Sequence, residues 1–353
     1  MIQTRDKKSS RLFVMNTRQE QFKELFPTEP TYRWKQIQTG LFSDARDWSE
    51  VSTLPVGIRE QMKDVPWMSV SAEQVLVSSN GDTHKAILNV EGENQIETVL
   101  MRNRRGMWTI CVSSQVGCAM RCGFCATGKM GLTRSLTSDE IIDQYRSWNL
   151  YLLENELGER ISNIVFMGMG EPLANYENVR EALNTILEYT DIGHTRITVS
   201  TVGVLPRLEQ ILEDETWPHV RLAISLHSAI EITRKQIVPT SYDEFLPRLK
   251  EWSRAYLAKF GNRRHHLTFE YVMLKGVNDT PEHSKALAKF VRGIGNVRVN
   301  LIPYNLTGVE YQCSAPAAVQ EFYDYLNNNG VIVTTRMSMG NDIEAACGQL
   351  IKE

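Results

Sequence analysis

From residue 107 onward the chain alternates between strand-like and helix-like segments, and this alternation constrains its fold more than any other feature. The strand-like runs are short and rich in Val, Ile and Leu, and helical apolar spacing separates most of them. Such an order is typical of a parallel sheet covered by helices. The strand-like runs are 109–113, 161–168, 196–201, 220–227, 267–274, 297–304 and 331–335, and the helix-like segments include 137–155, 177–188, 243–259, 281–292 and 316–328.

About six strand–helix units are too few for a closed eightfold barrel. We therefore expect an α/β fold, an incomplete and open (β/α)6 barrel, over residues 105–353. Thr137 and Glu140 have the spacing of a capping box, which predicts that the first barrel helix begins beside them.

The first 104 residues follow a different pattern. Helical apolar spacing predicts an N-terminal helical accessory domain over residues 1–70. Residues 71–104 change to β-like runs, with the turn signal Asn80-Gly81 between the first two, which predicts a small β meander. The expected helices are 19–25, 32–41 and one starting near Pro55, and the β-like runs are 71–79, 83–91 and 95–102.

The net charge of −3 indicates no particular partner, although basic residues gather in three places. A basic run is more often a solvated face than a phosphate-binding surface, and both interpretations stay open. No apolar run approaches the length of a membrane span and no signal peptide is evident, so we expect a cytoplasmic protein. The basic clusters are Arg5, Lys7, Lys8, Arg11, Arg18, Lys23, Arg33 and Lys35; Arg102, Arg104 and Arg105; and Arg263, Arg264, His265 and His266.

Three of the six cysteines form the clearest chemical signal, because a cytosolic protein uses cysteine for metals or catalysis more than for structural disulfides. Cys118, Cys122 and Cys125 have C-x3-C-x2-C spacing, and Phe124 precedes the last of them. Three thiolates can bind three irons of a cubane cluster and leave the fourth iron open. The motif resembles that of the radical SAM superfamily, in which S-adenosylmethionine (SAM) binds the open iron. A zinc site with a distant fourth ligand is the alternative.

Polar residues and glycines stand at the ends of successive predicted strands. The carboxyl ends of parallel barrel strands meet at one edge, where barrel enzymes build their sites. Each residue alone is more often a turn or core residue, but the shared location favours a binding site, in which Glu171 could accept a hydrogen bond from the SAM amine. The candidates are Gly170, Glu171, Ser200, Ser225, Leu226, His227 and Asn305.

The remaining cysteines lie outside this motif. Cys111 ends the first predicted strand of the barrel, Cys347 lies near the C-terminus, and Cys313 lies in a predicted loop. A free cysteine is usually a small buried hydrophobe, and Cys313 keeps that interpretation.

Several long motifs resemble the RlmN/Cfr family of radical SAM RNA methyltransferases, over nearly the whole chain from Pro30 onward. Residues 32–37 are similar to the helical element at the N-terminus of that family. Pro172 and Pro303 resemble the RlmN branch, since the Cfr branch typically has Ala and Arg there. The matching segments are 111–118, the cluster motif with 126–128, 167–173, 225–228 and 345–350.

The resemblance implies methylation of carbon 2 of an adenosine in the peptidyl-transferase centre of 23S rRNA, and of the adenosine 3′ of the tRNA anticodon. It implies a [4Fe–4S] cluster, two SAM molecules per turnover and a one-electron donor such as flavodoxin. We expect a monomer that does not associate with membranes.

The resemblance also implies roles for three residues outside the cluster motif. Carbon 2 of adenine is electron-poor and cannot attack SAM as a nucleophile, so a cofactor must supply radical chemistry. Cys347 would accept a methyl group and carry the resulting radical to the base, and Cys111 would release the product through a transient disulfide. Glu97 matches the proposed proton acceptor, and an exposed strand carboxylate is the alternative.

Three other functions stay open. The first is methylation of carbon 8, as in the Cfr branch. The second is a radical SAM enzyme with a peptide or small-molecule substrate, which predicts no role for Cys111 and Cys347. The third is a structural or electron-transfer iron–sulfur protein, although such proteins normally close the cluster with a fourth cysteine.

Overall fold

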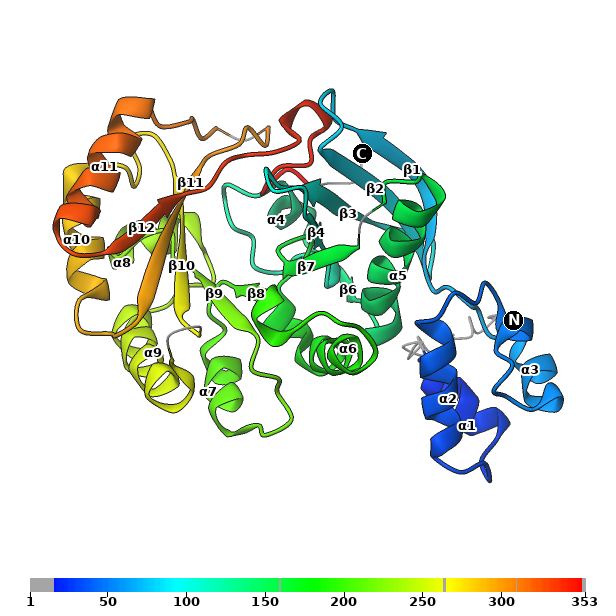
Figure 1. Cartoon of the computed structure of the whole chain (residues 1–353). Coiled ribbons are helices and arrows are strands. Elements are labelled where there is room, and N and C mark those ends of the chain that lie inside the picture. Colours follow the sequence, from blue (N-terminus) through cyan, green and yellow to red (C-terminus); the bar gives the residue numbers. More distant parts are fainter. Residues whose placement is uncertain (1–15, 159, 263–264, 309, 351–353) are drawn as a thin grey trace, which may run out of the picture. The chain divides into compact units, whose positions relative to one another are not determined.

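The computed structural model describes residues 16–158, 160–262, 265–308 and 310–350, and the chain divides into two compact units, Met1–Trp67 and Met68–Glu353 (Figure 1). The smaller unit is helical and packs around its own apolar core, which includes Phe22, Ile37 and Met62. Its elements are α1 (Arg18–Leu25), α2 (Tyr32–Leu41), a 3-10 helix (Trp48–Glu50) and α3 (Val56–Met62). The three predicted helices are confirmed, and α3 begins directly after Pro55.

The larger unit is built on one ten-stranded sheet with the order β1-β2-β3-β4-β7-β8-β9-β10-β11-β12. Neighbours from β1 to β4 are antiparallel, and neighbours from β4 to β12 are parallel. This is the expected open (β/α)6 barrel, with the meander as an extension of the same sheet. The strands are β1 (Ser71–Val77), β2 (Thr83–Val90), β3 (Asn94–Arg102), β4 (Trp108–Cys111), β7 (Ile161–Phe166), β8 (Ile197–Thr201), β9 (Arg221–Ser225), β10 (Leu267–Met273), β11 (Val297–Pro303) and β12 (Ile332–Thr335).

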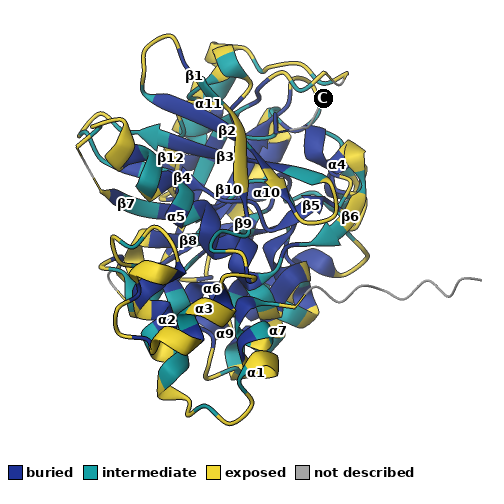
Figure 2. Cartoon of the chain, turned by 90° about the vertical axis from the view of Figure 1, so that its right-hand side faces the viewer, coloured by how far each residue is buried: buried dark blue, intermediate teal, exposed yellow. Residues whose placement is uncertain are grey.

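Helices join the parallel strands and turn their buried faces toward the sheet, as Figure 2 shows by its colours. Three of them, α4, α7 and α8, and the separate pair β5–β6 were not predicted, because such short elements carry little periodicity. Among the described residues, no helix is long and apolar enough to cross a membrane. The helices are α4 (Ala126–Met130), α5 (Ser138–Glu154), α6 (Tyr176–Tyr189), α7 (Leu205–Glu213), α8 (Glu231–Ile237), α9 (Phe245–Phe260), α10 (Pro281–Val291) and α11 (Pro316–Asn328), and the pair is β5 (Gln115–Gly117) with β6 (Leu132–Ser135).

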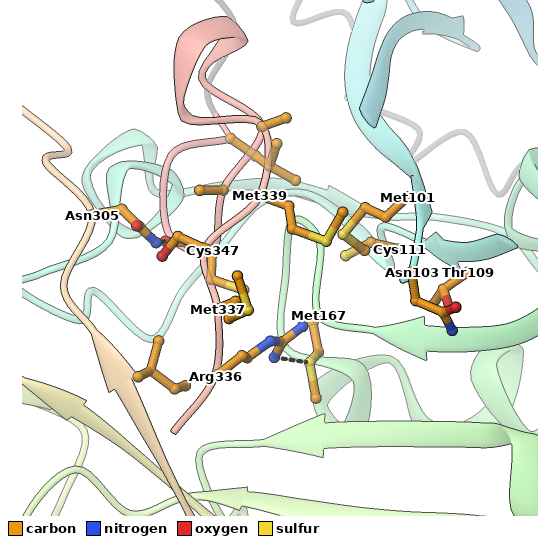
Figure 3. A pocket seen from close by; sticks show the side chains of 15 residues that line it. Met101, Asn103, Thr109, Cys111, Met167, Asn305, Arg336, Met337, Met339 and Cys347 are labelled. Carbon is orange, nitrogen blue, oxygen red and sulfur yellow. Dashed lines mark hydrogen bonds between the residues drawn. The ribbon is translucent and has the colours of Figure 1, made fainter. Parts of the chain in front are cut away.

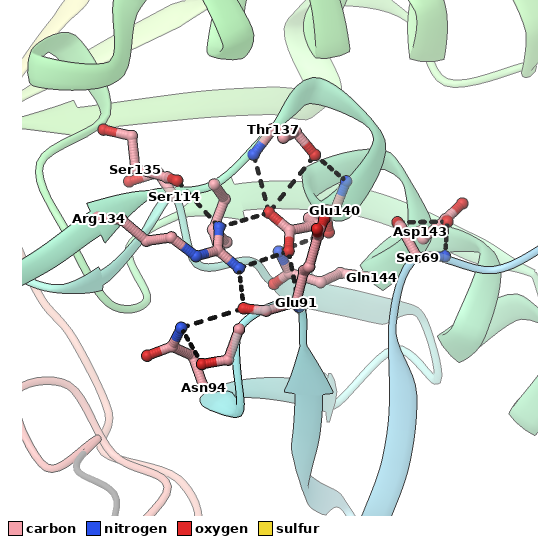
Figure 4. Close-up of polar contacts among 12 residues, drawn as sticks. Ser69, Glu91, Asn94, Ser114, Arg134, Ser135, Thr137, Glu140, Asp143 and Gln144 are labelled. Carbon is pink, nitrogen blue, oxygen red and sulfur yellow. Dashed lines mark hydrogen bonds and ion pairs between the residues drawn. The ribbon is translucent and has the colours of Figure 1, made fainter. Parts of the chain in front are cut away.

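The start of α5 has the predicted capping box, drawn in Figure 4. The Thr137 hydroxyl accepts from the backbone N–H of Glu140 at 3.2 Å, and the Glu140 carboxylate accepts from the N–H of Thr137 at 2.9 Å. The same buried carboxylate binds both terminal nitrogens of Arg134, at 2.8 and 2.7 Å. Because Arg134 belongs to β6, this contact fastens α5 to the segment that follows the clustered cysteines.

Thr137→Ala should lower the free energy of unfolding by about 1 kcal/mol, because it removes the acceptor for an unpaired N–H in the first turn of α5. Glu140→Ala should cost more, because it also leaves Arg134 without its carboxylate partner. Urea denaturation followed by circular dichroism measures both effects. Thr137→Ser keeps the capping oxygen and is the control; an equal loss in that variant would contradict the capping explanation.

Candidate active site

The three clustered cysteines lie between β5 and α4 and line one cavity of about 160 Å³. The other walls of this cavity come from the carboxyl ends of β7 to β12. Backbone hydrogen bonds hold the cysteine loop from both sides, because the Gly123 N–H donates to the Ile237 carbonyl at 2.9 Å and the Ala126 N–H donates to the Gly348 carbonyl at 2.8 Å. The structure therefore brings the three cysteines and the strand ends together around one cavity.

The donor set fits an iron–sulfur cluster. Burial, together with the neighbouring thiols, raises the pKa of Cys118 to about 12 and raises the pKa of Cys122 and Cys125 as well. Three thiolates this close need a bound cation, and a coordinating metal deprotonates a thiol outright. Within the described ranges, no three His, Cys, Asp or Glu side chains form a site for a single metal ion. A cubane does not require that convergence, because each thiolate binds a different iron.

Six of the seven strand-end candidates line the cysteine cavity, namely Gly170, Glu171, Ser200, Ser225, His227 and Asn305. Leu226, which was predicted with them as a cofactor-binding residue, does not line this cavity. Successive side chains of an extended segment point in opposite directions, so Ser225 and His227 face the cavity while Leu226 is fully buried in the core. The Leu226 N–H donates to the Glu270 carbonyl at 3.0 Å.

Glu171 is buried, and burial raises the pKa of its carboxyl group. Its two oxygens accept from the backbone N–H groups of Val202 at 2.8 Å and Leu173 at 3.0 Å. Gly170, just before it, has φ +99°, and an added Cβ would lie 2.5 Å from the Cβ of Gln115. A glycine is therefore needed at position 170 because the loop packs closely against Gln115 of β5. This packing requirement is separate from the predicted role of Gly170 in cofactor binding.

His227 is held in a fixed and neutral form. Its Nδ1 accepts from the backbone N–H of Val272 at 3.1 Å, which leaves the ring proton on Nε2. Burial lowers the pKa of the imidazole to about 3. Its backbone has φ +55°, a left-handed conformation that costs free energy for any residue with a side chain. The ring meets Phe124 edge-on at 4.7 Å between centroids, so the motif aromatic orients the histidine.

A second cavity of about 190 Å³ contains both outlying cysteines (Figure 3). Cys111 enters it from the end of β4 and Cys347 from the C-terminal segment. Residues that line both cavities include Cys347, Arg336 and Asn305, so the two cavities adjoin at Cys347. Four methionines add apolar, polarizable walls to the second cavity: Met101, Met167, Met337 and Met339.

Cys111 and Cys347 are both free thiols. Burial and, to a smaller extent, the nearby Cys347 raise the pKa of Cys111 to about 12, although the Arg336 guanidinium opposes the rise. The segment of Cys347 is anchored by its backbone, because Asn305 Nδ2 donates to the Cys347 carbonyl at 3.1 Å and Thr127 Oγ1 donates to the Leu350 carbonyl at 2.6 Å. A cysteine on a tethered segment can therefore face both cavities without a large loop movement.

The sequence analysis missed two charged residues of the site. Arg336 directly follows β12, lines both cavities and donates from Nη1 to the sulfur of Met167 at 3.1 Å. The same strand-end rule would have found it. Glu270 lies within β10 and lines the cysteine cavity; Oε1 accepts from Asn300 at 2.9 Å, whereas Oε2 has no partner among the described residues. Such an orphaned buried acceptor fits a cavity that takes a ligand with N–H or O–H donors.

Glu97 and Cys313 are not among the described residues that line either cavity. Glu97 is 2% exposed, which excludes the alternative of an exposed strand carboxylate, and its Oε1 lies 2.9 Å from Lys85 Nζ. Cys313 is exposed and its thiol donates to the Tyr304 carbonyl at 3.0 Å. The interpretation of Cys313 as a buried hydrophobe is therefore wrong, although its position outside the site agrees with the prediction.

Of the three basic clusters in the sequence, only some of the described residues form an exposed basic surface in the structure. The turn between β3 and β4 reaches the second cavity, because Asn103 lines it and Arg104 Nη2 donates to the sulfur of Met337 at 3.2 Å. His265 and His266 are buried and do not form a basic surface. Arg18 is also buried. Arg5, Lys7, Lys8, Arg11, Arg263 and Arg264 lie outside the described residues.

The open barrel and its three-cysteine cavity together define a radical SAM protein. The pattern of the Radical SAM superfamily matches residues 112–288. A solved structure of a radical SAM methyltransferase from Sphaerobacter thermophilus superposes with a TM-score of 0.85 at 35% identity, covering 94% of this chain and 96% of that one.

Two curated relatives show which family within this superfamily the chain belongs to. The "Dual-specificity RNA methyltransferase RlmN" of Alcanivorax borkumensis is 39% identical over 343 residues, covering 94% of this chain and 88% of that protein. The "Ribosomal RNA large subunit methyltransferase N" of Nitrosopumilus maritimus is 38% identical over 330 residues, covering 90% of this chain and 92% of that protein. The chain therefore belongs to the RlmN family of radical SAM RNA methyltransferases, whose cofactors are SAM and a [4Fe–4S] cluster.

Protein reconstituted without oxygen should contain about four iron and four sulfide per chain and be brown from thiolate-to-iron absorption. Replacing Cys118, Cys122 or Cys125 by Ala should remove the iron and the colour, as iron analysis and visible spectroscopy would show. Cys313→Ala is the matched control and should keep both. An intact cluster in any of the first three variants would contradict the ligand assignment.

Proposed function

We propose that this chain methylates carbon 2 of an adenosine in 23S rRNA, and of the adenosine 3′ of the anticodon in tRNA. One observation carries the proposal: Cys347 lies where the three-cysteine cavity adjoins a second cavity that also holds Cys111. A cysteine in this position can receive a group beside the cofactor and present it to a substrate on its other side. The names of the two relatives, both RNA methyltransferases, support RNA as that substrate.

The residues of the first cavity would hold the cofactors. Cys118, Cys122 and Cys125 would bind the [4Fe–4S] cluster, and SAM would lie against the strand ends that include Glu171 and His227. When bound, the cluster and SAM supply a carbon-centred radical, which this unreactive ring position requires. One SAM for that step and one as methyl donor make two per turnover. The neutral His227 adds no charge, so Nε2–H acts as a plain hydrogen-bond donor in the cavity.

The two outlying cysteines would divide the transfer between them. Cys347 accepts the methyl group through its thiolate, which is the competent nucleophile. After the carbon is joined to the base and the proton on carbon 2 is removed, the thiolate of Cys111 attacks the sulfur of Cys347. The S–C bond breaks, the released carbon keeps the electron pair and takes up a proton to become the methyl group, and a transient disulfide forms. The Arg336 cation lies beside both sulfurs and stabilises negative charge on them. A one-electron donor such as flavodoxin would supply reducing electrons.

Glu97 would take the proton from carbon 2. It lies two residues before Val99, which pairs with Cys111 across β3 and β4, so Glu97 and Cys111 share one face of the sheet. The Lys85 ammonium lies 2.9 Å from one oxygen of this buried carboxylate and holds it in place.

The target base must leave its stack to reach the second cavity, at a cost of a few kcal/mol that is lowest for unpaired bases. The Arg104 turn at this cavity would hold phosphates close to the flipped base, and the helical unit would add contacts to RNA shape. We expect the enzyme to act on this RNA in the cytoplasm and as a monomer.

Methylation of carbon 8 is the second candidate, and Pro172 and Pro303 favour carbon 2 because they match the RlmN branch. Mass spectrometry of nucleosides from cells with and without the gene decides between them. Gain of 2-methyladenosine supports the proposal, gain of 8-methyladenosine replaces it with the Cfr-type reaction, and no change in either nucleoside favours a non-RNA substrate.

Cys347→Ala and Cys111→Ala should fail in different ways. The first removes the atom that carries the methyl group, so RNA should stay free and unmodified. The second permits joining of protein and RNA but removes the resolving thiol, so a covalent protein–RNA species should accumulate on a denaturing gel. Cys313→Ser should keep activity within about tenfold, or ~1.4 kcal/mol of barrier. Normal methylation by Cys111→Ala without a crosslinked band would refute the disulfide step.

RNA affinity should fall steeply with salt if phosphate contacts dominate, while SAM affinity should stay nearly constant. Arg104→Gln should reduce the slope of log affinity against log salt by about one, because one phosphate contact is lost. Arg248→Gln, an exposed arginine on α9 paired with Glu209, is the control and should leave the slope unchanged. Fluorescence anisotropy with a labelled RNA measures these slopes; a flat response in the wild type would favour a small substrate.

A further inference from the structure

The strand register brings four side chains from the meander and the barrel onto one face of the sheet. Val99 pairs with Cys111 on β4 and with Lys85 on β2. Thr83 lies two residues before Lys85, and Glu97 lies two residues before Val99. Because side chains alternate along a strand, Thr83, Lys85, Glu97 and Cys111 all project to the same side. This is the side on which Cys111 meets the cavity that it shares with Cys347.

The C-terminal segment makes contacts along the same part of the sheet before it reaches Cys347. An added Cβ on Gly340, where φ is +69°, would lie 2.6 Å from Cγ2 of Thr83, so the segment touches β2 there. Lys85 Nζ then donates to the Glu344 carbonyl at 3.3 Å. Nearby, the Ser79 N–H donates to a carboxylate oxygen of Asp342 at 2.8 Å.

Lys85 and Glu97 are charged groups almost wholly removed from water, with side chains 6% and 2% exposed. A buried ammonium is stable only when it is paired and its remaining donors find acceptors. The 2.9 Å contact with Glu97 supplies the pair, and the ammonium has further N–H donors, one of which the Glu344 carbonyl accepts. The ion pair therefore holds the Lys85 ammonium where it donates to the carbonyl of Glu344, three residues before Cys347.

We propose that Lys85, held in place by Glu97, is a positioning residue that sets the place of Cys347 opposite Cys111. The inference rests on the proposed function, because that function needs one sulfur to face the cofactor cavity and then meet a second sulfur. It gives the meander a task in the reaction besides extending the sheet. It also gives Glu97 a second role, as the counter-ion that holds the lysine.

A small movement of Cys347 should affect its reaction with Cys111 strongly, because reactions between groups held in one protein are sensitive to small displacements. A shift of about 1 Å at a reacting atom can cost about a hundredfold in rate. The carbonyl of Glu344 is attached to a segment whose other end is fixed by Asn305 on the Cys347 carbonyl. Release of the Lys85 contact should leave Cys347 attached at that end, whereas the segment before it keeps the Asp342 contact with Ser79 and loses the contact nearest to Cys347.

The test uses the rate of disulfide formation between Cys111 and Cys347 to report how the two sulfurs are positioned, and it needs no RNA. Holoenzyme in a Cys313→Ser background is treated with diamide, which accepts two electrons and two protons as Cys111 and Cys347 form a disulfide. Peptide mapping without reductant follows the bond over time. Lys85→Met should slow its formation about tenfold or more. Lys63→Met is the matched control, since Lys63 forms an exposed pair with Glu60, and it should react at the wild-type rate.

Lys85→Met removes the ammonium group from beside a buried carboxylate and could unfold the larger unit. The double variant Lys85→Met with Glu97→Leu removes both charged groups of the pair and is measured beside it. Thermal melting and iron content identify the folded variants. A folded variant that forms the disulfide within about twofold of the control refutes the inference, and so does a wild-type chain that forms none. RNA methylation is scored separately: a wild type that forms the disulfide but does not methylate RNA refutes the proposed function and leaves the positioning role standing.

Discussion

The hydrogen-bond register of one ten-stranded sheet is the constraint on which the rest of the structure depends. Parallel pairing from β4 to β12 brings the carboxyl ends of these strands to one edge, so that residues far apart in the sequence line a common cavity. Antiparallel pairing of β3 with β4 places the meander beside Cys111 on a single face. A slip of one residue in either pairing would turn these side chains to the opposite side.

Burial gives the site its chemical character. Burial lowers the pKa of the His227 imidazole and raises the pKa of the Cys111 thiol, and the few charges in the site act strongly on their neighbours. Arg336 is the cation beside both outlying sulfurs, and the methionines around it are soft and apolar. An environment of this kind suits sulfur and radical chemistry, because its apolar walls keep water away from the reacting groups.

Sequence patterns predicted the fold well where periodicity was strong. The barrel strands, the long helices, the α5 capping box and the meander all appear close to their predicted positions. The short helices α4, α7 and α8 were missed because one to three turns carry little periodic signal. His265, His266 and Arg18 were assigned to basic clusters, although packing buries them; burial depends on neighbours distant in sequence, which local composition does not reveal.

The cysteine spacing, the strand-end residues and the long motifs by themselves determined the class of chemistry, because ligand type and order along the chain are local properties. Only the tertiary structure decided that Leu226 faces the core, that Arg336 lines both cavities, and that Glu97 is buried against a lysine. It also decided that Cys347 adjoins both cavities. The physical reason is that each of these facts depends on which strands pair and in what register, and long-range pairing is set by the packing of the whole unit.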